Sequence, residues 1–148
     1  ILEKRERIAE LEAQYEAISL AAQTLSDADA ELQSRFSPAL GRRAAEYLSR
    51  MTDGRYTDVA VARDFSVLLR RAGEAAPRQA LYLSAGAADL MYLAVRLAIV
   101  ELTLPGEDPC PIVLDDALVN LDSERREAAM RLLSEIAEKR QVILFTCN

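Results

Sequence analysis

Two short apolar runs in the second half of the chain constrain its fold most strongly. Residues 112–114 and 142–145 consist entirely of aliphatic and aromatic side chains, which is typical of strands buried on both faces. Between them, residues 123–139 carry apolar side chains at helical spacing. A strand, a helix and a strand in this order predict a βαβ unit with parallel strands and a right-handed crossover. The sequence therefore predicts a fold of the α/β class.

The segment before this unit predicts a hairpin and further helices. Residues 56–61 alternate with β-branched side chains, and an apolar run follows at 65–69 after a short polar link, so a β-hairpin is expected. Small residues at 84–86 open a long apolar helix that the proline-containing segment 105–109 ends. Ser37 followed by proline predicts that another helix begins there, with Thr52, Asp53 and Gly54 ending it.

The first 36 residues carry a heptad pattern. Its apolar positions alternate in steps of three and four, with one polar exception at Asp29. They are Ile8, Leu11, Tyr15, Ile18, Ala22, Leu25, Leu32 and Phe36. The spacing predicts a coiled-coil helix, although an amphipathic helix lying on a globular core would show it as well. We therefore expect residues 1–36 to be the end of a longer coiled coil, and residues 37–148 to form a globular lobe.

The composition excludes some classes of function. A net charge of −6 and a pI near 4.8 oppose a broad nucleic-acid interface, which is usually basic, so any DNA contact is expected to be local or to lie outside this chain. No apolar run reaches the about 18 residues of a membrane span. Cys110 and Cys147 lie far apart and the chain has no histidine. We expect reduced thiols in a cytoplasmic protein with no membrane contact.

Two aspartates directly follow the first apolar run. Ligands of α/β sheets collect at the carboxyl ends of strands, and Mg²⁺ is held by one or two carboxylates together with waters and phosphates. Asp115 and Asp116 are therefore candidates for the site of a nucleotide-bound Mg²⁺. The alternative is that both aspartates cap the turn that follows the strand.

A second candidate site lies at the start of the long apolar helix. Ser84, Ala85 and Gly86 place backbone N–H groups and a hydroxyl at a helix N-terminus without a bulky side chain nearby, which suits a phosphate. The alternative is that Ser84 is an ordinary N-cap.

In order and spacing, these motifs resemble those of ABC-type ATPases. Residues 83–87 resemble the signature motif, with Ala85 where a second glycine is usual. Residues 112–116 resemble the Walker B strand, residues 119–122 the D-loop, and residues 142–146 the strand that leads into the switch loop. The helix after the signature and the segment that joins coil to head are similar to those of SMC-like proteins. The chain is identified as resembling the C-terminal head lobe of an SMC-like ABC-type ATPase.

The resemblance implies a role for each matching residue. Asp115 would position Mg²⁺, and Asp116 stands where a glutamate usually activates the attacking water, with a shorter reach. Ser84, Ala85 and Gly86 would bind ATP held by a second head, in a dimer that sandwiches the nucleotide. The D-loop residues Asn120 and Asp122 would lie at that dimer interface.

Two elements of the family are not found in the sequence. A Walker A loop needs a Gly-Lys pair, but Lys4 and Lys139 are the only lysines and neither follows a glycine. In SMC-like proteins this loop lies in an N-terminal lobe, beyond the coiled coil. The switch histidine is also missing: either Cys147 or Asn148 replaces it, or the chain ends just before it.

The implied function is ATP hydrolysis at a head dimer interface, coupled to DNA maintenance, chromosome segregation or repair. The implied partners are the protein's own N-terminal Walker A lobe, a second head, a coiled-coil partner helix, and DNA through the full-length protein, with a possible place on the nucleoid. This chain alone is expected to be inactive. An alternative is a catalytically degenerate dimerisation module that binds nucleotide without turnover. An ABC transporter ATPase is disfavoured because such proteins do not normally enter this lobe from a heptad helix.

Overall fold

The computed structural model describes residues 2–62, 66–104 and 110–147. The chain divides into two compact units, Ile1–Phe36 and Ser37–Asn148. The predicted polar link at 63–64, the predicted helix-ending segment 105–109 and Asn148 lie outside the described residues. No helix among the described residues has the length and hydropathy to cross a membrane.

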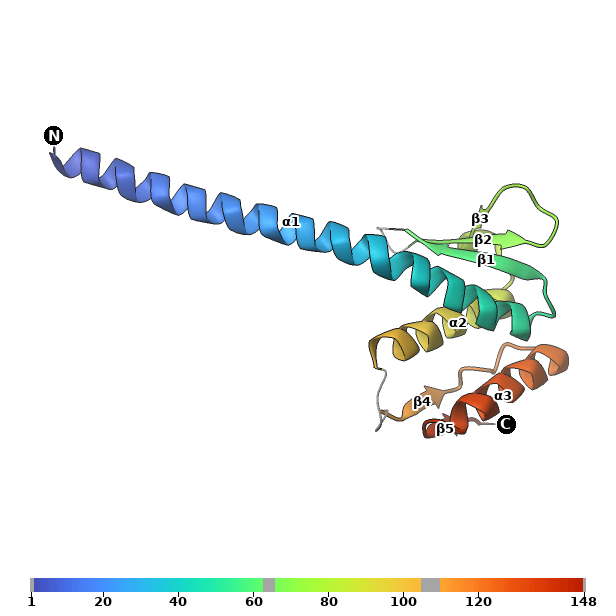
Figure 1. Cartoon of the computed structure of the whole chain (residues 1–148). Helices are drawn as coiled ribbons and strands as arrows, with labels where there is room; N and C mark the ends of the chain where they lie inside the picture. Colours follow the sequence, from blue (N-terminus) through green and yellow to red (C-terminus); the bar gives the residue numbers. More distant parts are fainter. Residues whose placement is uncertain (1, 63–65, 105–109, 148) are drawn as a thin grey trace. The chain divides into compact units, whose positions relative to one another are not determined.

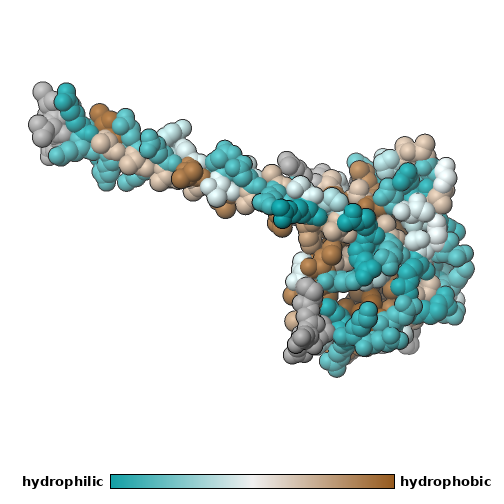
Figure 2. All heavy atoms as spheres, in the orientation of Figure 1, coloured by the Kyte–Doolittle hydropathy of each residue, from teal (hydrophilic) through white to brown (hydrophobic). Residues whose placement is uncertain are grey.

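The first unit is helical and leaves its heptad positions exposed up to Leu32, while Phe36 is half-buried. It belongs to α1 (Leu2–Met51), and Figure 2 shows apolar side chains along it among hydrophilic ones. Tyr15, Ile18 and Leu25 are 73%, 69% and 72% exposed. Pairs one turn apart support the helix, such as Arg7 with Glu10 at 2.6 Å. The helix therefore presents the apolar seam that a coiled-coil partner requires.

The predicted start of a new helix at Ser37 is wrong, because α1 continues through Ser37 and Pro38 to Met51. The physical reason is that helical spacing of apolar residues runs up to Phe36 and again from Leu40, while the proline between them removes only one hydrogen bond of the helix. The helix ends where the sequence predicted. Gly54, at φ 71°, donates its N–H to the Ser49 carbonyl at 2.9 Å and closes the last turn.

A small antiparallel sheet follows. β1 (Tyr56–Val61) pairs with β2 (Val67–Arg71), which confirms the predicted hairpin, and β3 (Arg78–Gln79) pairs with β2 on its other side. Val59 and Leu69 are buried and face each other in the register. A Cβ on Gly41 of α1 would overlap the Val59 carbonyl oxygen, so a glycine is needed where the helix and β1 meet.

The predicted βαβ unit is present. After η1 (Ala80–Tyr82) and α2 (Ala85–Thr103), the chain forms β4 (Ile112–Asp115), α3 (Ser123–Ala137) and β5 (Val142–Phe145). The two strands are parallel, and Ile112 pairs with Val142 at one end and Asp115 with Phe145 at the other.

The core of the second unit lies around α2. This helix buries Leu90, Met91 and Ala94 completely, and Figure 1 shows it between the end of α1 and the β4–α3–β5 segment. Leu132 of α3 is 1% exposed. Ile112, at the start of β4, is 8% exposed and belongs to the same buried set.

Candidate nucleotide site

Asp116 starts the turn at the carboxyl end of β4. Its backbone N–H donates to the Phe145 carbonyl at 3.0 Å, and its own carbonyl accepts from the Val119 N–H at 3.3 Å. Its φ of 47° lies in the left-handed region, which aspartate tolerates better than most residues. The turn therefore fixes the Asp116 backbone from both sides.

The Asp116 carboxylate contacts Cys147, which follows β5. The Cys147 backbone N–H donates to Oδ1 at 3.2 Å, and Sγ lies 3.2 Å from Oδ1 and 3.4 Å from Oδ2. This hydrogen bond, together with the negative charge of Asp116, raises the pKa of the Cys147 thiol. Cys147, one of the two positions that could replace the switch histidine, thus contacts the candidate catalytic residue, and Asn148, the other, lies outside the described residues.

Asp115 ends β4 and is exposed. Among the described residues, no three side chains of the metal-binding kinds gather into one cluster. An exposed carboxylate fits Mg²⁺ that takes its other ligands from water and phosphates. The donor set therefore suits an ion that arrives with a nucleotide.

The candidate phosphate site lies at the start of α2. Ser84 occupies the N-cap position in extended conformation, yet its side chain makes no capping hydrogen bond. Ordinary side-chain capping, the alternative considered for Ser84, is therefore absent. The hydroxyl and the first-turn N–H groups remain as the groups that could meet an anion.

The turn after Asp116 packs against this helix start. A Cβ on Gly86 would lie 3.0 Å from the Asn120 carbonyl oxygen, so glycine permits a close approach of the two backbones. The Asn120 side-chain amide donates to Asp89 Oδ2 at 2.9 Å. The structure thus brings together the candidate residues Gly86 and Asn120.

Asp122 has a local structural role. It is the N-cap of α3 and accepts the Arg125 backbone N–H at 2.9 Å, while its other oxygen lies 3.4 Å from the Arg125 guanidinium. This cap was not predicted, although an aspartate before a helical segment is the usual signal. Asp89, whose contact with Asn120 depends on tertiary packing, was not predicted either.

An apolar cavity of about 250 Å³ opens beside the carboxyl end of β5. Asp116 lines it together with Leu118, Val119, Arg126, Met130, Leu144, Phe145 and Thr146. Phe145 is 56% exposed and, on the neighbouring strand, Val113 is 60% exposed. Large apolar side chains therefore lie uncovered on the parallel strand pair.

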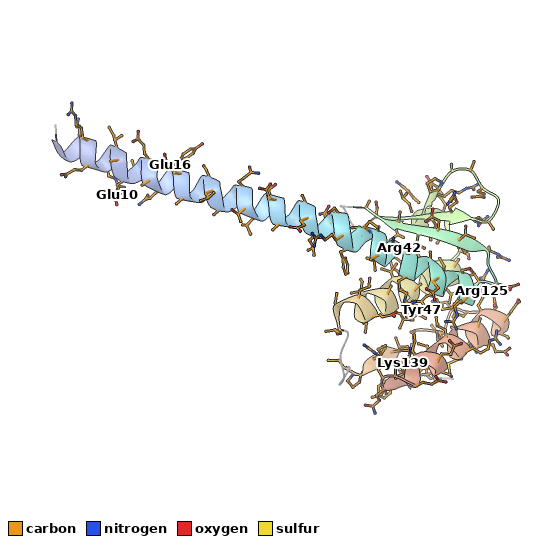
Figure 3. All side chains as sticks on the ribbon, viewed as in Figure 1. Glu10, Glu16, Arg42, Tyr47, Arg125 and Lys139 are labelled. Carbon is orange, nitrogen blue, oxygen red and sulfur yellow. The ribbon has the colours of Figure 1, made fainter. Side chains whose placement is uncertain are left out.

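A second cavity, of about 320 Å³, lies between α1, α2 and α3 and was not predicted. Figure 3 labels Tyr47 and Lys139, which both line it. Arg43 and Tyr47 both donate to the Glu101 carboxylate. Burial and the hydrogen bond to Glu101 raise the pKa of Tyr47 to about 12, and Arg43 lowers the pKa of Glu101. The Glu101 carboxylate of α2 thereby connects α2 to Arg43 and Tyr47 near the end of α1.

The fold matches that of SMC head domains. A structure described under ATP-driven dimerization and DNA stimulated activation of SMC ATPases matches with a TM-score of 0.65 and 20% identity, over 80% of this chain and 73% of that chain. The Smc head of Pyrococcus furiosus, with an extended coiled coil and bound to the C-terminal domain of ScpA, matches with a TM-score of 0.67 and 19% identity. That match covers 99% of this chain and 37% of the other. The predicted resemblance to an SMC head lobe is confirmed.

One curated relative can be named. Protein YhaN of Bacillus subtilis (strain 168) is 27% identical over 146 residues, which is 98% of this chain. The chain spans 15% of the length of YhaN. No protein-family model matches the chain.

Proposed function

We propose that this chain is the C-terminal lobe of an SMC-like ATPase head, which hydrolyses ATP once an N-terminal Walker A lobe completes the site. The observation that carries this proposal is the placement of Asp115 and Asp116 at the carboxyl end of the parallel β4–β5 pair, where α/β folds bind their ligands. The likeness to a structure of ATP-driven SMC dimerization supports it.

Each candidate residue then has a task. Asp115 would hold Mg²⁺, which supplies charge neutralisation on the phosphates when bound, and Asp116 would accept a proton from the attacking water. In an ATP-sandwiched dimer, the Ser84 hydroxyl and the N–H groups of Ala85 and Gly86 would contact the phosphate held by the other head. Each head would thus contribute residues to the ATP site of the other head, so the two heads would act together.

The uncovered strand pair supports the need for a second lobe. Parallel sheets are usually covered on both faces, and strand edges without partners promote association. Here Val113 and Phe145 are 60% and 56% exposed on adjacent strands. We infer that the protein's own Walker A lobe adds strands and apolar surface at this place.

The exposed heptad seam of α1 supports a coiled-coil partner helix. Work on DNA, in segregation or repair, would then belong to the full-length protein, in keeping with the DNA stimulated SMC ATPases named for the structural match. The net charge of −6 opposes a broad DNA interface on this chain, so its DNA contacts would be local or lie elsewhere in the full-length protein. A cytoplasmic, nucleoid-associated location is part of the proposal.

The test is ATP turnover by the full-length protein that contains this chain. Asp116→Asn is expected to lower kcat by about 10²-fold or more, the usual contribution of a general base. Asp58→Asn is the matched control, since Asp58 on β1 forms its ion pair with Arg70 on β2 and not with a residue of the candidate site. Unchanged turnover in Asp116→Asn would remove Asp116 from the mechanism. ATP-dependent dimerisation without turnover in the unaltered protein would favour the degenerate dimerisation module.

A further inference from the structure

We propose that Cys147 is a positioning residue for Asp116, holding the carboxylate with both its backbone N–H and its thiol. The inference rests on the proposed function, because Asp116 is the general base there. The resemblance to SMC heads leaves open whether Cys147 or Asn148 replaces the switch histidine, and it assigns Cys147 no contact with Asp116. The contact itself can be tested without nucleotide.

Hydrogen bonds hold both the backbone and the carboxylate of Asp116. Its backbone is fixed by hydrogen bonds to Phe145 and Val119, at 3.0 and 3.3 Å, and its side chain by the two Cys147 donors. The strand register makes this possible: Asp115 pairs with Phe145, so the residue after β4 meets the second residue after β5. A carboxylate held in this way loses little further freedom when it meets substrate.

The two carboxylate oxygens are not equivalent. Oδ1 receives both donors at 3.2 Å, whereas Oδ2 receives only the thiol at 3.4 Å. Oδ2 is therefore the oxygen with acceptor capacity left for a water molecule. Because aspartate is one methylene shorter than glutamate, fixed orientation matters more for Asp116 than it would for the longer side chain.

The first experiment measures thiol alkylation in the absence of nucleotide. Iodoacetamide modification of Cys147 is followed by mass spectrometry of the peptide, with the exposed Cys110 as a reference in the same molecule. Asp116→Ala is expected to speed the alkylation of Cys147 roughly threefold or more, because the thiol loses its acceptor and a neighbouring negative charge. Asp115→Ala removes an adjacent carboxylate that makes no bond to the thiol, so it should have the smaller effect. If Cys147 is alkylated at the same rate in the unaltered protein, in Asp116→Ala and in Asp115→Ala, the thiol does not contact Asp116 and the proposal is overturned.

The second experiment separates positioning from folding. In the full-length protein, Cys147→Ala is expected to lower kcat about tenfold with an unchanged KM, a loss that corresponds to one hydrogen bond, whereas Cys147→Ser, which keeps a donor, should restore most of it. Wild-type kcat in Cys147→Ala, or equal losses in both variants, would overturn the proposal. If the unaltered protein shows no turnover, the proposed function fails, while the alkylation rates still decide whether Cys147 holds Asp116.

Discussion

At the scale of single residues, Glu101 of α2 connects two side chains of α1, outside the candidate site. It accepts hydrogen bonds from Arg43 and Tyr47, and Arg43 also reaches Glu46 at 2.7 Å. Tyr47 is 7% exposed, so its hydroxyl depends on Glu101 for a partner. Ionisation of Tyr47 would place a second negative charge beside Glu101 in a poorly hydrated position.

This arrangement predicts a loss of stability at alkaline pH. The pKa of Tyr47 is raised from 10.0 to about 12, so the folded state binds this proton more tightly than the unfolded state. The stabilisation is complete below pH 10 and is lost as the pH rises toward 12. Tyr47→Phe should reduce that loss, as measured by urea midpoints from pH 9 to 12. Tyr15→Phe, at an exposed position, is the control, and parallel curves for all three proteins would contradict the prediction.

The residues of the candidate site differ in how far the sequence could place them. Asp115 and Asp116 could be placed at a strand end because the apolar run before them is unambiguous. The contact between Asp116 and Cys147 could not, since it requires the register of β4 and β5 and a positive φ at Asp116. Neither is encoded in local spacing, and the catalytic roles stay predictions.

At the scale of elements, α1 shows where local signals fail. Ser37 and Pro38 carry the signal of a helix start, yet the helix runs through them. Local preference of this kind amounts to about 1 kcal/mol, and the helical patterns on both sides of Pro38 outweigh it. The hairpin and the βαβ unit were predicted correctly because their patterns and their burial agree.

The junction of α1 with β1 predicts that Gly41→Ala destabilises the second unit. The added methyl would overlap the Val59 carbonyl oxygen, and the resulting shift should cost about 1–3 kcal/mol, which exceeds the about 1 kcal/mol that alanine gains in a helix. Thermal unfolding would show a lower Tm. Ser34→Ala, at an exposed position of the same helix, should leave it unchanged; a raised Tm in Gly41→Ala would show that β1 yields without cost.

The seam of the first unit predicts that charge at its apolar positions disrupts pairing. Ile18→Glu combined with Leu25→Glu removes two side chains worth about 1.5–3 kcal/mol each when buried. Limited proteolysis of the full-length protein should then cut within residues 1–36. The control Ser19→Glu with Ser26→Glu adds the same charge next to the seam and should resist cleavage. Equal cleavage of both variants would argue against a partner on this face.

At the scale of the whole molecule, the division at Phe36 and Ser37 predicts that the second unit folds alone. A chain of residues 37–148 should unfold within about 2 °C of the chain of residues 1–148, because, among the residues whose burial is described, the buried side chains all lie in that range. In this shorter chain, Ser37 and Pro38 would stand at a real helix start, in the positions that suit them. A much lower Tm, measured by calorimetry, would show that residues 1–36 contribute to its stability.

Pro38 has a mechanical consequence for the molecule as a whole. Proline cannot donate to the carbonyl four residues before it, so α1 lacks one bond of its ladder next to the division between the two units. A helix bends most easily where its hydrogen-bond ladder is interrupted, which is commonly the turn before a proline. A sideways force on residues 1–36 would therefore bend α1 first at the turn before Pro38.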